Sequence, residues 1–183
     1  MSRLPAIDPA QATGKTKTLL DAVQASLGVT PNLMRTMANS PTVLEGYLQF
    51  SQALAGGVLS AQLREQIALV VAETNVCDYC VAAHTAIGAS VGLDNIELVN
   101  SRAGKANDPK VDAALKFART VVRSRGQVAD ENIERVRQAG YGDAEIAEIV
   151  ANVVLNILTN YINLVAETEV DFPHVEVLAS AAN

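Results

Sequence analysis

The sequence contains no tryptophan and few other aromatic residues, with four tyrosines and three phenylalanines among 183 residues. Bulky aromatic side chains can therefore supply little of its core. Hydrophobic residues still make up 49% of the chain, and many of them are alanine, valine or leucine. Small aliphatic side chains suit closely packed helices, and the chain is long enough to enclose one sizeable core.

Basic residues are also in short supply. Lysine and arginine number 14 against 20 aspartates and glutamates, which gives a formal net charge of -6. Binding to nucleic acid needs a basic face that neutralises phosphates, so this balance argues against a nucleic-acid partner.

Neither a secretory signal nor a long uninterrupted apolar run is visible. Met1–Thr13 is polar and contains prolines, unlike a charged start followed by an apolar stretch. The most apolar segment, residues 146–165, is interrupted by Asn152, Asn156 and Asn160, whereas a membrane span needs ~20 apolar residues. We expect a soluble, cytoplasmic protein with no membrane partner.

No convincing strand alternation is present, whereas apolar residues recur at helical spacing along most of the chain. Helices are expected at about residues 15–27, 31–35, 41–55, 61–74, 77–91, 93–99, 109–124, 131–138 and 143–169. Connections are short and no low-complexity linker separates them. We therefore predict a single all-α domain over residues 1–183, with residues 1–14 as an extended N-terminal arm.

Cysteine and histidine are scarce, with two of each, yet three of these four residues fall together. Cys77 and Cys80 form a CxxC pair, and His84 follows four residues later. On a helix these three side chains share one edge. Two thiols so close can form a disulfide, and a nearby imidazole can stabilise a thiolate or take its proton. The spacing therefore predicts a redox-active dithiol.

Two effects compete over which thiol is the nucleophile. If the helix begins near Val76, Cys77 lies in its first turn, where the helix dipole favours an anion. The imidazole of His84, one turn further along, favours Cys80. Either effect lowers a cysteine pKa from ~8.5. The thiolate would attack the O–O bond of a peroxide, and the second thiol would condense with the resulting sulfenic acid.

The CxxC pair also has other interpretations. Buried thiols are also ordinary packing residues. A zinc site is less well supported, because CxxC and His84 give three ligands where a structural site takes four, and His174 lies far along the chain. A thioredoxin-like protein would place CxxC after a strand, and that context is missing.

Glu65 is the candidate for a third functional group beside the dithiol and His84, one that would orient the imidazole. It lies on the helix before the CxxC segment, and its carboxylate would orient the imidazole of His84 if the two helices fold back on each other. A solvated glutamate beside Arg64 is the alternative. Glu73, near the end of the same helix, is a second acid close to the pair in sequence.

The pattern Glu65-x11-Cys77-x-x-Cys80-x-x-x-His84 resembles the core motif of the alkylhydroperoxidase D-like proteins, which belong to the carboxymuconolactone decarboxylase superfamily. The segments at residues 31–35, 40–41 and 160–173 resemble the longer, peroxidase-related branch. The resemblance implies a multi-helix bundle with the CxxC at the start of a helix. It also implies homo-oligomers, such as dimers, trimers or hexamers.

The resemblance further implies a thiol peroxidase that needs no cofactor or metal. Cys80 would be the peroxidatic cysteine and Cys77 the resolving one, with His84 and Glu65 relaying the proton. The partners would be a small hydroperoxide and a thiol or dithiol reductant. One departure is Tyr79, where the best-known members have a histidine; tyrosine, with a reference pKa of ~10, is a poorer proton carrier.

Two functions of other classes remain as alternatives. The superfamily includes a cofactor-free lactone decarboxylase, whose activity would survive loss of the cysteines and would need a basic residue in the pocket to bind the substrate anion. A redox-sensing protein would instead change its assembly with the state of its disulfide.

A polar stripe adds a further candidate feature. Asn152, Asn156, Asn160 and Asn163 recur on one side of an otherwise apolar helix. Buried asparagines are costly unless they are hydrogen-bonded, so the stripe predicts either a pocket lining or an oligomer interface, or else a narrow solvent-exposed face.

Overall fold

The computed structural model describes residues 2–176 and 178, and all regular structure in that part of the chain is helical, as predicted. The helices are α1 (Gly14–Leu27), α2 (Asn32–Met37), α3 (Pro41–Ala55), α4 (Ala61–Thr74), α5 (Asp78–Ser90), α6 (Asn95–Arg102), α7 (Pro109–Ser124), α8 (Asp130–Gln138) and α9 (Asp143–Ala166). Residues 2–13 contain no helix and lie along α2 and the end of α9.

Most helix boundaries follow from local sequence. The Ser60 hydroxyl accepts a hydrogen bond from a backbone N–H in the first turn of α4. Pro41 stands at the start of α3, where its missing N–H costs nothing, and Gly28 ends α1 in a left-handed conformation. The last helix is shorter than expected: it ends at Ala166, and Glu167 adopts a left-handed conformation with φ 49°.

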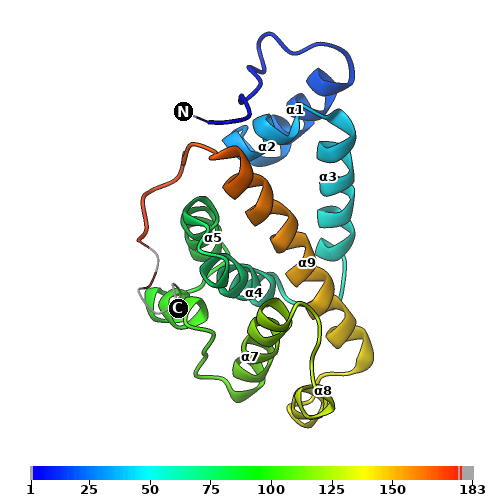
Figure 1. Ribbon diagram of the computed structural model, residues 1–183, viewed down its shortest axis with the longest axis vertical. Coiled ribbons are helices and arrows are strands. Elements are labelled where there is room, and N and C mark those ends of the chain that lie inside the picture. The colour runs from blue at the N-terminus through cyan, green and yellow to red at the C-terminus, as the bar shows by residue number, and fades with distance from the viewer. Residues whose placement is uncertain (1, 177, 179–183) are drawn as a thin grey trace.

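Helix α4 lies at the centre of the bundle, in contact with α5, α6, α7 and α9 (Figure 1). Its side chains Ile67, Leu69, Val70 and Val71 are fully buried. One core cluster fills the space between α4, α7, α8 and α9. A second joins α1, α2, α3 and α5, and both cysteines belong to it.

A tight turn connects α4 to α5 and folds α5 back against α4. Val76 takes a left-handed conformation with φ 54°, and the backbone N–H of Cys77 bonds to the carbonyl of Ala72. Helix α5 therefore begins at Asp78, and Cys77 is its N-cap residue. The condition under which Cys77 would lie in the first turn, a helix that begins near Val76, is therefore not met. As a result Cys80, rather than Cys77, lies in the first turn of the helix.

Helix α9 crosses the molecule between α3 and the α4–α5 pair (Figure 1). Its four asparagines are between 0% and 6% exposed, so the stripe faces the protein interior and is not a solvent-exposed face. Within the described part of the chain, α9 is the one helix that is long and apolar enough to cross a membrane. Core helices of soluble proteins also meet this criterion of length and composition.

Candidate active site

The two cysteines are joined by a disulfide at the start of α5, with a Cα–Cα distance of 5.3 Å. Both residues are buried, with Cys77 1% and Cys80 2% exposed. They differ in their surroundings. Cys80 lines a pocket of about 310 Å³ between α2, α3, α4, α5 and α9, whereas Cys77 is not part of its wall. Of the two cysteines, only Cys80 therefore lines a space that a small molecule can occupy.

His84 and Glu65 line the same pocket and form a pair. The distance between His84 Nδ1 and Glu65 Oε2 is 2.8 Å, and the two side chains are 19% and 18% exposed. A carboxylate can only accept a hydrogen bond, so Nδ1 carries the hydrogen and Nε2 is left to exchange a proton within the pocket. The fold-back of α5 on α4 thus places Glu65 against His84, and the alternative of a solvated Glu65 does not hold.

Glu73 has a different environment. Its carboxylate pairs with the guanidinium of Arg102 at 2.8 Å between Oε2 and Nε, and the two side chains are 3% and 6% exposed. Glu73 also accepts a hydrogen bond from the backbone N–H of Leu178, and Arg102 donates to the carbonyl of Glu176. This buried pair fastens the C-terminal segment to α4 and α6, and it is not part of the pocket wall.

Tyr79 is 4% exposed, and its side chain contacts α2 and the segment that follows α9. The oxygen accepts a hydrogen bond from the backbone N–H of Leu33 at 3.1 Å, and the side chain of Asp171 lies nearby. The ring packs edge-to-face on Phe172, with centroids 5.7 Å apart. Burial, followed by the neighbouring carboxylate of Asp171, raises the pKa of Tyr79, so the phenol stays protonated at neutral pH.

The asparagine stripe meets the site through Asn163, whose Nδ2 donates to the Sγ of Cys80 at 3.3 Å. One turn earlier, Asn160 accepts from the side chain of Asn75 at 2.9 Å, which ties α9 to the α4–α5 turn. Asn152 and Asn156 line the pocket and donate to backbone carbonyls of α9 itself. Polar positions on an apolar helix were the sequence signal, but the contact with Cys80 could not be foreseen from spacing.

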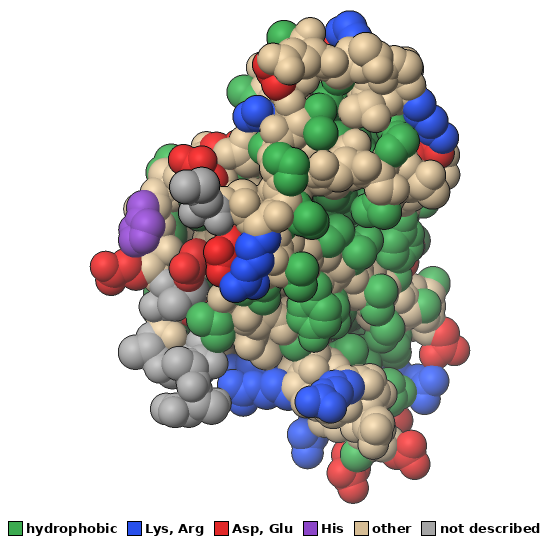
Figure 2. Space-filling model, turned by 45° about the horizontal axis from the view of Figure 1, so that its top comes forward, with side chains coloured by type: hydrophobic (Ala, Val, Ile, Leu, Met, Phe, Trp, Pro, Cys, Tyr) green, Lys and Arg blue, Asp and Glu red, His purple; other side chains and the backbone are tan. Residues whose placement is uncertain are grey.

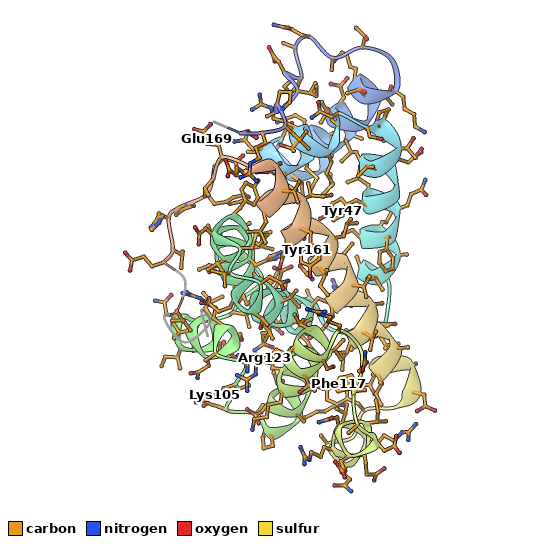
Figure 3. The ribbon with its side chains drawn as sticks, in the orientation of Figure 1. Tyr47, Lys105, Phe117, Arg123, Tyr161 and Glu169 are labelled. Carbon is orange, nitrogen blue, oxygen red and sulfur yellow. A yellow bond between two sulfur atoms is a disulfide. The ribbon has the colours of Figure 1, made fainter. Side chains whose placement is uncertain are left out.

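Two further polar side chains in the pocket were missed from the sequence. Tyr47 extends from α3 toward α9 (Figure 3) and lines the pocket. Burial raises its pKa, and the nearby charge of Glu65 adds to that effect. Arg64 also lines the pocket, and its Nη1 donates to the carbonyl of Leu59 at 2.6 Å. It brings a positive charge to the pocket wall.

A second hollow of about 410 Å³ lies near the N-terminal ends of α4, α7 and α9. None of its lining residues is a cysteine or a histidine, so it does not share the dithiol chemistry. Within residues 2–176 and 178, no group of three or more histidine, cysteine, aspartate or glutamate side chains is arranged to hold a metal ion.

Comparison with known proteins agrees with this architecture. Residues 41–123 match the model of the Carboxymuconolactone decarboxylase family, and no curated protein matches the sequence. The structure is similar to that of an uncharacterized peroxidase-related protein with an alkylhydroperoxidase AhpD core from Ralstonia eutropha JMP134. The TM-score is 0.83 at 26% identity, over 93% of this chain and 92% of that one.

Two more solved structures share the fold. One is an uncharacterized peroxidase-related protein from Silicibacter sp. TM1040, with a TM-score of 0.81 at 24% identity over 92% of this chain and 91% of that one. The other is a variant of the debrominase Bmp8 in complex with 2,3,4-tribromopyrrole, with a TM-score of 0.78 at 17% identity over 93% and 94%. The match to the family model over residues 41–123 and the similarity to these structures support assignment to the carboxymuconolactone decarboxylase/alkylhydroperoxidase D superfamily.

Proposed function

We propose that the protein is a thiol-dependent peroxidase of the alkyl hydroperoxide reductase type. The observation that carries this proposal is the position of Cys80. This residue lines a pocket that is also lined by the His84–Glu65 pair, and it is bonded to a second cysteine outside that pocket. A nucleophile, a proton carrier and a resolving thiol are thereby brought together around one small cavity.

The proposed cycle begins with both cysteines reduced. His84 takes the proton of the Cys80 thiol, and the thiolate attacks the terminal oxygen of a hydroperoxide. The O–O bond breaks, Cys80 becomes a sulfenic acid, and the departing alkoxide takes the proton back from His84 as an alcohol. The Cys77 thiol then attacks the Cys80 sulfur and releases water. The product is the disulfide present in this structure, and two electrons from a thiol or dithiol reductant restore the pair.

The start of α5 supports these roles for the two cysteines. Cys80 lies in the first turn, where unpaired backbone N–H groups and the helix dipole stabilise a thiolate. Cys77 is the N-cap residue and lies outside the pocket wall, so it has access to Cys80 but not to a substrate. The dipole and the imidazole, which were expected to compete, both favour Cys80 in this geometry.

The pocket supports a small organic hydroperoxide as substrate. Apolar side chains such as Leu33, Leu54, Ile87 and Phe172 make up much of its wall, and Tyr79 and Cys80 also line it. A volume of about 310 Å³ suits a small molecule rather than a polymer. Apolar walls would hold an alkyl or aryl group, while the amide of Asn163 lies beside the sulfur.

We also propose that the protein forms a homo-oligomer. From Ile149 to Ala166 helix α9 has no charged residue, and its outer side chains Val154, Leu158 and Val165 are 51%, 39% and 63% exposed. On the neighbouring α3, Phe50 is also partly exposed. On the face drawn in Figure 2, hydrophobic side chains gather toward the side where α3 and α9 run, and most charged side chains lie at the periphery. A second copy of the chain would cover this surface.

A cofactor-free lyase is the second candidate function, because the pocket contains the basic residue that it requires. Arg64 lies in the pocket wall beside Glu65 and His84, and could bind the carboxylate of a lactone substrate. His84 would then move a proton within the substrate. This function does not use the dithiol, so replacement of both cysteines by serine would leave it intact.

The test is the rate at which pre-reduced protein forms the Cys77–Cys80 disulfide with cumene hydroperoxide, followed by mass spectrometry of the quenched reaction. Cys80→Ser should abolish it, and His84→Ala should slow it by about 100-fold, as expected for loss of a general acid–base group. His174→Ala is the matched control, because the second histidine is exposed and outside the pocket. Wild-type oxidation no faster than that of free cysteine would reject the proposed function.

A further inference from the structure

The Cys80 sulfur has one side-chain hydrogen-bond partner in the described part of the chain, the carboxamide of Asn163. The Nδ2–Sγ distance is 3.3 Å, within the range for a bond to sulfur, and Asn163 is 4% exposed. Although His84 lies in the same pocket, its only side-chain bond is to Glu65. The group that contacts the reactive sulfur directly is therefore an amide on α9, more than eighty positions away in sequence.

The position of this amide is fixed by the neighbouring turns of α9. Asn160, fully buried one turn earlier, bonds to Asn75 at the α4–α5 turn and so sets the register of α9 against the CxxC segment. Asn163 also lines the pocket, and its Oδ1 is buried without a hydrogen-bond partner among the described residues. Such an orphaned acceptor costs stability unless a ligand or an intermediate satisfies it.

We propose that Asn163 is a further catalytic residue, whose amide N–H stabilises the Cys80 thiolate and whose carbonyl oxygen binds the O–H of the hydroperoxide. This inference rests on the proposed role of Cys80. A thiolate accepts a hydrogen bond more strongly than a thiol, so the Nδ2 contact favours the charged form of the buried sulfur. Among the described side chains, Asn163 is the one that donates a hydrogen bond directly to the sulfur, and this bond offsets part of the cost of burying that charge.

The two ends of the carboxamide would serve successive states of the reaction. While the thiolate is present, Nδ2 donates to Sγ and Oδ1 accepts from the O–H of the peroxide oxygen that is attacked. After the O–O bond breaks, that oxygen and its hydrogen belong to the sulfenic acid of Cys80, and Oδ1 can keep the same hydrogen bond. The unpartnered acceptor in the disulfide form would thus gain its partner only when substrate or sulfenic acid is present.

The test measures the ionisation of Cys80 in the Cys77→Ser background, where it is the one remaining thiol. The rate of alkylation by iodoacetamide is recorded against pH. Asn163→Leu keeps the side-chain volume and removes the donor, so the midpoint should rise by about 1 to 2 pH units, the effect of one hydrogen bond to a charged group. Asn163→Ala should give the same direction. Asn163→Asp should raise the midpoint further, because a carboxylate repels the thiolate.

Asn156→Leu is the matched control. Asn156 is also buried in the pocket wall on α9, but its side chain donates to the Asn152 carbonyl and does not contact sulfur, so the alkylation midpoint should not move. A purely structural role of Asn163 would change unfolding without changing the midpoint. The proposal is overturned if folded Asn163→Leu or Asn163→Ala protein keeps the wild-type midpoint, or if Asn156→Leu shifts it equally.

The peroxide reaction is tested separately with the same variants. Asn163→Leu should lower the rate of peroxide oxidation at a pH where Cys80 is fully ionised, because the Oδ1 contact with the substrate is lost as well. An unchanged rate at that pH would overturn the carbonyl half of the proposal. If wild-type protein does not react with peroxide at all, the proposed function fails, while the alkylation profile still decides whether Asn163 stabilises the thiolate.

Discussion

Replacing Tyr79 with phenylalanine separates a structural role of this residue from a role in the proton relay. The change removes one oxygen and keeps the ring, so the edge-to-face contact with Phe172 remains and no large cavity forms. What is lost is the acceptor for the Leu33 backbone N–H, a buried donor that is then left unsatisfied. An orphaned buried N–H costs about 1 to 3 kcal/mol. Loss of the hydroxyl beside Asp171 adds little, because that carboxylate is exposed and keeps the hydrogen bond from the Asn32 backbone N–H.

We therefore expect Tyr79→Phe to lower the free energy of unfolding by about 1 to 3 kcal/mol, measured by urea denaturation. The rate of peroxide oxidation should stay within about twofold of wild type, because the hydroxyl faces α2 and not the His84–Glu65 pair. A tenfold or greater loss in the rate of peroxide oxidation with an unchanged free energy of unfolding would refute this reasoning. It would indicate that the Tyr79 hydroxyl takes part in the proton relay.

Three further predictions concern stability and assembly. Arg102→Ala leaves the carboxylate of Glu73 buried and unpaired, so the free energy of unfolding should fall by about 3 to 5 kcal/mol in urea denaturation; a loss below about 1 kcal/mol would contradict a buried pair. Burial raises the pKa of Tyr141 to about 12 from 10.0, so the folded state keeps a proton that the unfolded state releases. The free energy of unfolding should therefore be independent of this group below pH 10 and should fall as the pH rises toward 12. Urea denaturation repeated between pH 10 and 12 should show a smaller decline for Tyr141→Phe than for wild type. An identical decline in the two proteins would contradict this role of Tyr141. Leu158→Glu on the exposed face of α9 should reduce the assembly to a smaller species in light scattering, and an unchanged mass would place the interface elsewhere.

The sequence was sufficient to predict the helices and the grouping of the dithiol with its histidine. Helical periodicity, the cap at Ser60 and the proline at Pro41 are local signals, and the helices begin where these signals place them. The CxxC spacing is equally local. These features depend on residues within a few positions of one another, which is why they can be derived without a structure.

The details that decide the chemistry depend on longer-range geometry. The left-handed turn at Val76 moves the start of α5 by two residues and so places Cys80, not Cys77, in its first turn. Glu73 and Glu65 lie on one helix, and only the arrangement of α6 shows that Arg102 pairs with Glu73. The contact between Asn163 and Cys80 joins segments that no short-range pattern relates.

The central claim is that Cys80 is the cysteine that a hydroperoxide oxidises to a sulfenic acid. Locating that sulfenic acid after a single turnover tests the claim most directly. Cys77→Ser and Cys80→Ser proteins are each treated with one equivalent of cumene hydroperoxide and dimedone, and the adduct is located by mass spectrometry. The account predicts a sulfenic acid adduct on Cys80 in the Cys77→Ser protein and no adduct on Cys77 in the Cys80→Ser protein. An adduct on Cys77, or none on either cysteine, would contradict it.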